Sequence, residues 1–329
     1  MPLLGFESRI KRTPALVVTQ SDLAAYKTDR ASWALSGYLG LRPKNEPVIG
    51  PLRLGTRVHS ALEMFYGYGH DLVDSYNDIA ESELASLKES GILFDENAWR
   101  KETDMGRIML AGYVEYLEET GADVDLKVVG AEEKLSHIID VDGTAVELRG
   151  KIDLRVLNTF TNQHLVVDFK TTNSFEKLTS TAHLSDQLKI YMLLEKLAHK
   201  ENPEHHLQGA LFIMFRKVRR GPTSKPPYYD RCEVHHSPAK IKSYYYQVFG
   251  TLRDYVRTVK ALDAGADPRL VAYPTPHPWT QYNEFRHVID MMGDGDDQRV
   301  RDMINDLFVQ QDPHERYNVA PADLLSQIA

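Results

Sequence analysis

Cysteine is nearly absent from this chain of 329 residues, in which Cys232 stands alone. A single thiol excludes an intrachain disulfide and any zinc or iron–sulfur site built from four thiolates. Long apolar runs are missing as well, because no stretch approaches the roughly 18–20 apolar residues that a membrane span needs. The N-terminal segment lacks an apolar signal-peptide core, so we expect no export, no membrane partner and a cytoplasmic location.

Positive charge is not in excess either. The formal net charge of −8 argues against broad electrostatic wrapping of nucleic acid, although a local basic groove remains compatible with it. One candidate for such a groove is the run from Arg216 to Arg220, followed by Lys225. The sequence leaves two interpretations open: a solvated strand end and loop, or a patch that contacts phosphate.

What the chain does contain is typical of a globular protein with a sizeable core, with 42% hydrophobic and 26% charged residues. The hydrophobic period is helical first, then alternates as in strands, and becomes helical again. This order predicts an α/β fold with a mixed sheet. We expect a helical N-terminal region over residues 1–125, a sheet-bearing core over 126–236 and a helical C-terminal region over 237–329.

The core begins with a predicted meander of four strands. A strand from Val128 turns back at Asp142-Gly143, and the return strand covers Thr144–Leu148. We expect a third strand to begin at Gly150 and a fourth to end at Lys170. The polar segment Asn158–Asn162 is typical of a hairpin connection between these last two.

Two carboxylates and an ammonium are expected on one surface of this meander. Asp153 lies on the third predicted strand, while Asp168 and Lys170 are two residues apart on the fourth. Side chains alternate along a strand, so Asp168 and Lys170 project to one side and Phe169 packs on the other. Such a surface suits a hard cation and an anionic substrate.

A histidine upstream is a further candidate ligand. His59 and Glu63 are four residues apart on a predicted amphipathic helix that begins near Gly55, so they share a face. Such a pair on its own is more often structural than metal-binding.

These residue types fit the hydrolysis of a phosphodiester. The reaction needs charge neutralisation on the phosphate and a deprotonated water, and one or two Mg²⁺ or Mn²⁺ ions held by carboxylates supply both. Lys170 would stabilise the attacking water or the developing negative charge. An imidazole ligand such as His59 would favour Mn²⁺.

The chain resembles the RecB-type branch of the PD-(D/E)XK nuclease superfamily, and within it the CRISPR-associated and bacteriophage RecB-like exonucleases. The resemblance covers roughly residues 20–290. It depends on four motifs in order, which are Gly55-Thr-Arg-Val-His59, Gly150-Lys-Ile-Asp153, Asp168-Phe-Lys170 and Gln187-x-x-x-Tyr191.

The resemblance implies a restriction-endonuclease-like core and a metal-dependent exonuclease acting on DNA that is single-stranded or has free ends. It also implies DNA recombination, repair or processing, the host cytoplasm if the protein is phage-encoded, and room for an oligomer. The implied metal ligands are His59, Asp153, Asp168 and the main-chain carbonyl of Phe169. Lys170 is the implied catalytic lysine, and Gln187 and Tyr191 are implied to place the DNA or the lysine. An acid on the first strand often supports the site in these families; Glu132 is the better candidate here and Glu133 the alternate.

The chain departs from many such relatives in one respect. They hold an iron–sulfur cluster with one cysteine near the N-terminus and three near the C-terminus, whereas Asp29, Thr280 and Asn283 stand at the corresponding positions here. We therefore expect no iron–sulfur cluster. The two ends are expected to pack together through other side chains.

Three alternatives compete with the nuclease hypothesis. Asp153, Asp168 and Lys170 could form a structural salt bridge, or the chain could be a catalytically inactive DNA-binding or scaffold protein on a nuclease fold. A zinc hydrolase using His205-His206 or His235-His236 is disfavoured, because neither pair has an acidic third ligand at a recognisable spacing. Those histidines are expected at the surface.

Overall fold

The sheet is assembled on one long strand, β4 (Thr144–Asn158), in the computed structural model, which describes residues 4–315 except 222 and 279. Along its whole length β4 pairs antiparallel with β3 (Leu126–Val141). Its first half also pairs parallel with β1 (Leu16–Thr19), and its second half pairs antiparallel with β5 (Gln163–Thr172). The predicted mixed sheet is thereby confirmed.

Two further strands extend the sheet beyond β5. β6 (Leu207–Arg216) is parallel to β5, and β7 (Tyr229–His235) is antiparallel to β6 at the edge. The six strands follow the order β1-β4-β5-β6-β7, with β3 also paired to β4. Because β5 and β6 are parallel, the chain crosses over between them through a helix, as parallel pairs require.

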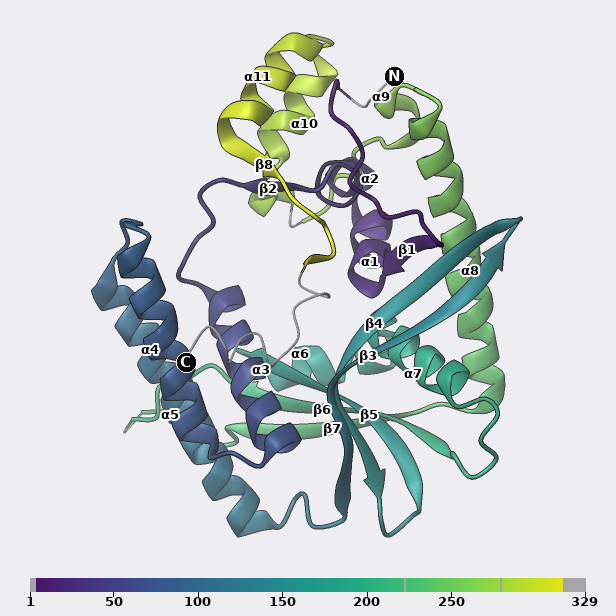
Figure 1. The fold of residues 1–329 in the computed structure, drawn as a ribbon. Helices are drawn as coiled ribbons and strands as arrows, with labels where there is room; N and C mark the ends of the chain where they lie inside the picture. Colours follow the sequence, from purple (N-terminus) through teal and green to yellow (C-terminus); the bar gives the residue numbers. More distant parts are fainter. Residues whose placement is uncertain (1–3, 222, 279, 316–329) are drawn as a thin grey trace.

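Helices cover both faces of the sheet (Figure 1). On one face α3 (Pro51–Tyr68), α4 (Leu72–Glu89) and α5 (Glu96–Thr120) share an apolar core with β4, β5 and β6. On the other face α7 (Asp186–Ala198) packs on the same strands together with the start of α8 (Pro238–Asp263). The crossover helix between β5 and β6 is α7.

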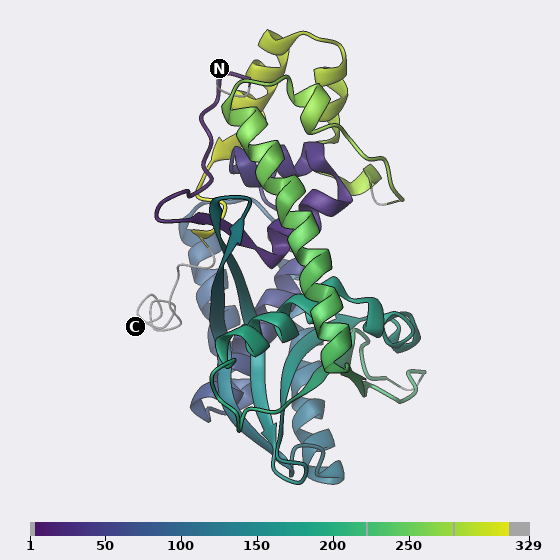
Figure 2. The same cartoon turned by 90° about the vertical axis from the view of Figure 1, so that its right-hand side faces the viewer.

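The described N-terminal and C-terminal segments pack together beyond the sheet. The long helix α8 runs from the sheet into this part, as Figure 2 shows. There the N-terminal helices α1 (Gln20–Thr28) and α2 (Arg30–Trp33) share one core with the later helices. The other elements are short: a π-helical turn Ala34–Tyr38, β2 (Leu41–Pro43), α6 (Phe175–Thr179), 3₁₀ turns Ala182–Leu184 and Thr280–Tyr282, α9 (Pro268–Val271), α10 (Arg286–Gly293), α11 (Asp297–Leu307) and β8 (Phe308–Gln310).

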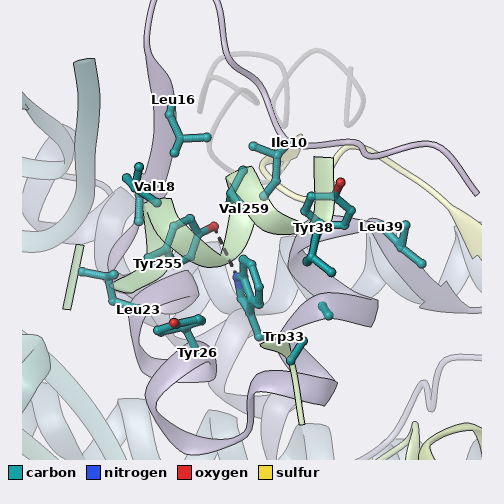
Figure 3. Packing of buried hydrophobic residues seen from close by; sticks show 14 of the residues in the cluster. Ile10, Leu16, Val18, Leu23, Tyr26, Trp33, Tyr38, Leu39, Tyr255 and Val259 are labelled. Carbon is teal, nitrogen blue, oxygen red and sulfur yellow. Dashed lines mark hydrogen bonds between the residues drawn. The ribbon is translucent and has the colours of Figure 1, made fainter. Parts of the chain in front are cut away.

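A cluster of aromatic rings lies within the core that joins the N-terminal helices to α8 (Figure 3). Trp33 is fully buried, and its ring contacts Tyr26 and Tyr255 at centroid distances of 5.0 and 4.7 Å. The indole N–H donates to the Tyr255 hydroxyl at 3.2 Å, which satisfies a donor that burial would otherwise leave without a partner. α2 is therefore fixed to α8 by packing and by a hydrogen bond.

Asp29 forms the polar part of the same junction. Its carboxylate caps α2 by accepting the N–H groups of Ala31 and Ser32, and it also accepts the N–H of Thr275 at 3.3 Å. Nearby, the Asn283 amide donates to the Ser32 hydroxyl at 2.5 Å. Side-chain contacts thus connect the segment around Asp29 to the segment that contains Thr275 and Asn283, as expected.

The predicted four-stranded meander is wrong, because β4 continues without interruption through Gly150. This glycine faces α7, and a Cβ at this position would lie 2.7 Å from Leu194 Cδ1 and 3.3 Å from the Tyr191 ring. Gly150 is thus required for the close approach of a helix to a strand and not for a turn. The meander has three strands, and the hairpin at residues 159–162 is confirmed.

Two further features of the described residues complete the fold. No helix among them is long and apolar enough to cross a membrane. The predicted C-terminal region 237–329 is helical as far as it is described, but β8 also pairs antiparallel with β2. The rest of that region, residues 316–329, lies outside the described residues.

We predict that Asp29→Ala destabilises the protein more than the loss of an ordinary helix cap. An exposed cap is worth about 1 kcal/mol, and Asp29 in addition bonds a distant segment, so we expect a loss of about 2–3 kcal/mol in the free energy of unfolding. Urea unfolding followed by circular dichroism measures the difference. Asp95→Ala, which removes the exposed cap of α5, is the matched control; equal losses in the two variants would contradict a special role for Asp29.

Candidate active site

Two aspartates face each other where β4 and β5 separate. The ladder between these strands stops at Leu154 and Val167, one residue short of Asp153 and Asp168. Asp153 spans the opening, since its Oδ2 accepts the main-chain N–H of Phe169 at 2.8 Å. The end of strand pairing thus brings both carboxylates to one place.

Asp168 is a buried acid beside a lysine. It is 0% exposed, and Lys170 Nζ lies 2.5 Å from its Oδ2. Its Oδ1 accepts no hydrogen bond within the described part of the chain. Burial raises the pKa of Asp168 to about 6, with Lys170 opposing and the charge of Asp153 reinforcing the shift.

Lys170 is held by a chain of hydrogen bonds from α7. Its ammonium donates to Gln187 Oε1 at 2.9 Å, and the Gln187 amide donates to the Tyr191 hydroxyl at 3.0 Å. Gln187 and Tyr191 are one turn apart on α7, so they present adjacent side chains to β5. The lysine also lies 5.8 Å from the centroid of the Phe212 ring. Its position is therefore set from two sides.

His59 reaches the aspartates from α3 on the opposite face. Its Nδ1 lies 3.3 Å from Asp153 Oδ2. Burial alone would lower the pKa of His59, but the charges of Asp153, Asp168 and Glu132 outweigh it and raise the pKa to about 9. The same contact and the Phe169 N–H hold the pKa of Asp153 below its ordinary value against the effect of burial. Without a bound ion, imidazolium and carboxylate stabilise one another.

Glu132 and Glu133 lie on opposite faces of β3. Ligand atoms of Glu132, His59 and Asp153 lie within 4.8 Å of one another, and Lys151 pairs with Glu132. Glu133 instead contacts Arg155 on the α7 side at 2.5 Å. Glu132 has a positive φ of 49°, which marks an irregularity of the kind that re-aims side chains next to active sites.

The donor set fits a divalent cation. Three acids, Asp153, Asp168 and Glu132, surround one imidazole and two ammonium groups, and Asp168 Oδ1 has no hydrogen-bond partner among the described residues. Burial raises the pKa of Glu132 to about 7, with Asp153 adding to the effect and Lys151 opposing it. Oxygen-rich sites of this kind favour Mg²⁺ or Mn²⁺. An ion here would relieve the repulsion among the acids.

A second polar cluster on the α7 side corrects one expectation. His205 is buried and not at the surface, and its Nε2 lies 2.7 Å from Glu195 Oε1, an acid that sequence spacing did not connect with it. Together with His199 these groups resemble a metal site, but Arg155 forms two hydrogen bonds to Glu195 and one to His199.

That second cluster fits a metal ion poorly. The rings of His199 and His205 are stacked at 4.3 Å with only 11° between their planes, so their in-plane lone pairs cannot converge on one ion. An ion would also have to displace the guanidinium of Arg155. The cluster is better described as an ion-pair network that joins β4 to α7.

Two residues at the first site had not been predicted as members. Lys151 is two residues from Asp153 on β4 and so shares its face, which was the available signal, and Glu63 is one helical turn from His59. Glu63 is 6% exposed, and burial raises its pKa although Lys151 and Lys134 oppose the shift. Alternation and helical spacing give the faces of these residues, but not the contact between α3 and β3.

Comparison with known proteins identifies the family. The chain belongs to the PD-(D/E)XK nuclease superfamily, whose family model matches residues 17–288. A nuclease that uses divalent metal ions is what this membership implies. Among solved structures, the crystal structure of SSO0001 matches at 15% identity over 60% of this chain and 84% of that chain, with a TM-score of 0.25. No curated protein matches the chain.

We predict that His59 titrates far above an ordinary histidine in the metal-free protein. Its imidazole should lose its proton at about pH 9, and Asp153→Asn should bring this pKa down toward the ordinary value of about 6.5. Because the folded pKa is raised, the stabilisation is complete below about pH 6.5 and is lost as the pH rises through about 9. Proton NMR of the histidine rings in the presence of EDTA measures the pKa of His59, and the His59→Gln variant assigns its signal. Titration of His59 near pH 6.5 would contradict the ion pair with Asp153.

Proposed function

We propose that this member of the superfamily is a metal-dependent exonuclease that hydrolyses phosphodiester bonds of DNA. The observation that carries the proposal is the convergence of two buried acids, the half-buried Glu132, His59 and Lys170 at one opening of the sheet. A structural salt bridge would need only one acid for Lys170. Acids so close together repel one another, and a bound cation would relieve that repulsion, which favours a catalytic role over a structural one.

The proposed ligands are His59, Asp153, Asp168 and the main-chain carbonyl of Phe169. Glu132, the supporting acid, lies close enough to His59 and Asp153 to be a further ligand. A bound Mg²⁺ or Mn²⁺ would neutralise charge on the phosphate and lower the pKa of a water molecule. We assign one or two ions to the site. To bind an ion, His59 must give up the proton that its contact with Asp153 stabilises.

Lys170 is the proposed catalytic lysine. Its ammonium lies beside Asp168 and can donate a hydrogen bond to the attacking water or to the phosphate oxygen where negative charge develops. Gln187 holds this ammonium by accepting one of its hydrogen bonds, and Tyr191 in turn accepts from Gln187. These two residues thereby orient Lys170 before substrate arrives, which reduces the cost of ordering it during the reaction.

The loop after β6 is the proposed contact for the DNA backbone. Arg216 pairs in register with Thr172, two residues beyond Lys170, so it lies on the same face and at the same end of the sheet. Arg219 and Arg220 bond to Lys101 and Glu115 of α5, and these contacts hold the loop in place.

Two lysines of this loop are available to an anion. Lys217 and Lys225 form no ion pair within the described part of the chain, and the main-chain N–H of Lys217 donates to Thr172 at 2.7 Å. A phosphate next to the one being hydrolysed would lie within reach of this end of the sheet. Local positive charge of this kind can bind DNA although the whole chain has a net charge of −8.

The finer points of the proposal come from the four ordered motifs. They favour exonuclease action on DNA that is single-stranded or has free ends, within recombination, repair or processing. The second candidate function, a catalytically inactive DNA-binding or scaffold protein, would keep the basic loop without turnover. The presence of His59, Asp153, Asp168 and Lys170 in one site argues against it.

We predict metal-dependent degradation of end-labelled linear DNA that stops when Lys170 is replaced by Met. The variant should lose at least ~10³-fold in rate, because it lacks the cation at the developing charge, and Gln187→Ala should lose about 10–100-fold through misplacement of the lysine. The assay compares Mg²⁺, Mn²⁺ and EDTA on single- and double-stranded substrates.

Closed circular DNA tests the exonuclease assignment, since it should resist cleavage. Lys196→Met, which changes an exposed lysine farther along α7, is the matched control and should keep wild-type rates. Undiminished cleavage by a folded Lys170→Met variant would overturn the role of the lysine. DNA binding without any cleavage by the wild type would favour the inactive binding protein.

We also predict that Lys217→Gln combined with Lys225→Gln weakens DNA binding and its salt dependence. Each lost phosphate contact lowers the slope of log affinity against log salt by about 0.9 on duplex DNA, so the double variant should lose ~1–2 units of slope. Fluorescence anisotropy in EDTA measures binding without cleavage. The control is the double variant Lys127→Gln and Lys196→Gln, which changes two exposed lysines away from this end of the sheet. An unchanged slope in the loop variant would exclude the loop as a contact for the DNA backbone.

A further inference from the structure

Lys151 lies where it competes with a metal ion. Its ammonium pairs with Glu132, whose carboxylate is within 4.8 Å of the ligand atoms of His59 and Asp153. An ion coordinated by these three groups would compete with Lys151 for the Glu132 carboxylate. It would also repel the ammonium, because two positive charges would then lie within a few ångströms of each other. Lys151 therefore needs another acceptor when the site is loaded.

Glu63 lies opposite this pair. His59, Glu63 and Gly67 are spaced by four residues and form one stripe of α3. His59 contacts Asp153 at one end of the stripe, and at the other end a Cβ on Gly67 would lie 3.1 Å from the Cβ of Ala131, next to Glu132. Glu63 is in the middle of the stripe and thus faces the Glu132 and Lys151 pair.

The carboxylate of Glu63 has an unused acceptor. Its Oε1 is buried and accepts no hydrogen bond among the described residues. A buried carboxylate oxygen without a donor is costly, so it is seldom kept without a role. Glu63 also lies close enough to contribute to the raised pKa of both Lys151 and Glu132. One lysine thus faces two acids and pairs with only one of them.

We propose that Glu63 is a positioning residue that receives Lys151 when a divalent ion binds His59, Glu132 and Asp153. The exchange frees Glu132 for the ion, keeps the ammonium paired and gives Glu63 its missing donor. The number of buried charges without a partner stays low in both states. This inference rests on the proposed function, because it assumes that the site binds a metal ion.

A double-mutant cycle on metal binding tests the exchange without any measurement of activity. Calorimetric titration of the DNA-free protein with Mn²⁺ compares wild type, Glu63→Gln, Lys151→Met and the double variant. Glu63→Gln should weaken binding about tenfold when Lys151 is present and by less than ~2-fold when it is absent, since only the lysine needs the acceptor. Lys151→Met alone should tighten binding, because the competing ammonium is gone.

The controls separate the possible failures. Lys127→Met removes an exposed ammonium from β3 and should change Mn²⁺ affinity by less than ~2-fold. Thermal unfolding shows whether each variant is folded, and Glu63→Gln keeps the size of the side chain. No effect of Glu63→Gln, or equal weakening in both backgrounds, would overturn the exchange and would make Glu63 a bystander or a direct ligand. Absence of Mn²⁺ binding by the wild type would instead overturn the metal site and the proposed function with it.

Discussion

The burial of several carboxylates at one opening of the sheet is the constraint on which the rest of the site depends. Asp168 is completely shielded from solvent, and Asp153 and Glu132 are close by. Bringing like charges together in a poorly solvated place is unfavourable unless cations compensate for them. Three of the elements around the opening supply such compensation: α3 provides His59, β5 provides Lys170 and β4 provides Lys151.

The backbone of β4 makes this arrangement possible. Lys151 faces α3 and pairs with Glu132, whereas Arg155 faces α7 and pairs with Glu195. Strict alternation would put these two side chains on one face, so the strand is irregular between them. The irregularity coincides with the positive φ of Glu132 on β3 and with the end of pairing between β4 and β5. The site is thus located where the sheet departs from regular geometry.

Local pattern in the sequence was enough to predict the parts of the site that lie on one element. The relation of Asp168 to Lys170 follows from strand alternation, and that of Gln187 to Tyr191 follows from helical spacing. The meeting of α3 with β3 depends on tertiary packing, so the sequence alone gave no reason to join Glu63 with Lys151. Gly150 was wrongly expected to begin a new strand, again because tertiary packing decides its role: the glycine allows the close approach of α7 and does not form a turn. His205 was expected at the surface because its partner Glu195 lies on a different element.

The ion-pair network of Arg155 and Glu195, on the α7 side of β4, also helps to position the site. Gln187, Tyr191 and Glu195 follow one another at four-residue intervals on α7, so they form a single stripe that faces the sheet. At one end of this stripe Gln187 holds Lys170, and at the other end Glu195 is bonded twice by Arg155. A helix fixed by a buried bidentate pair cannot easily slide or rotate along its strand. The pair therefore fixes the position of α7 along β4, and with it the place where Gln187 contacts Lys170. Because Asp153 of the same strand contacts His59 of α3, β4 orients the helices on both faces of the site.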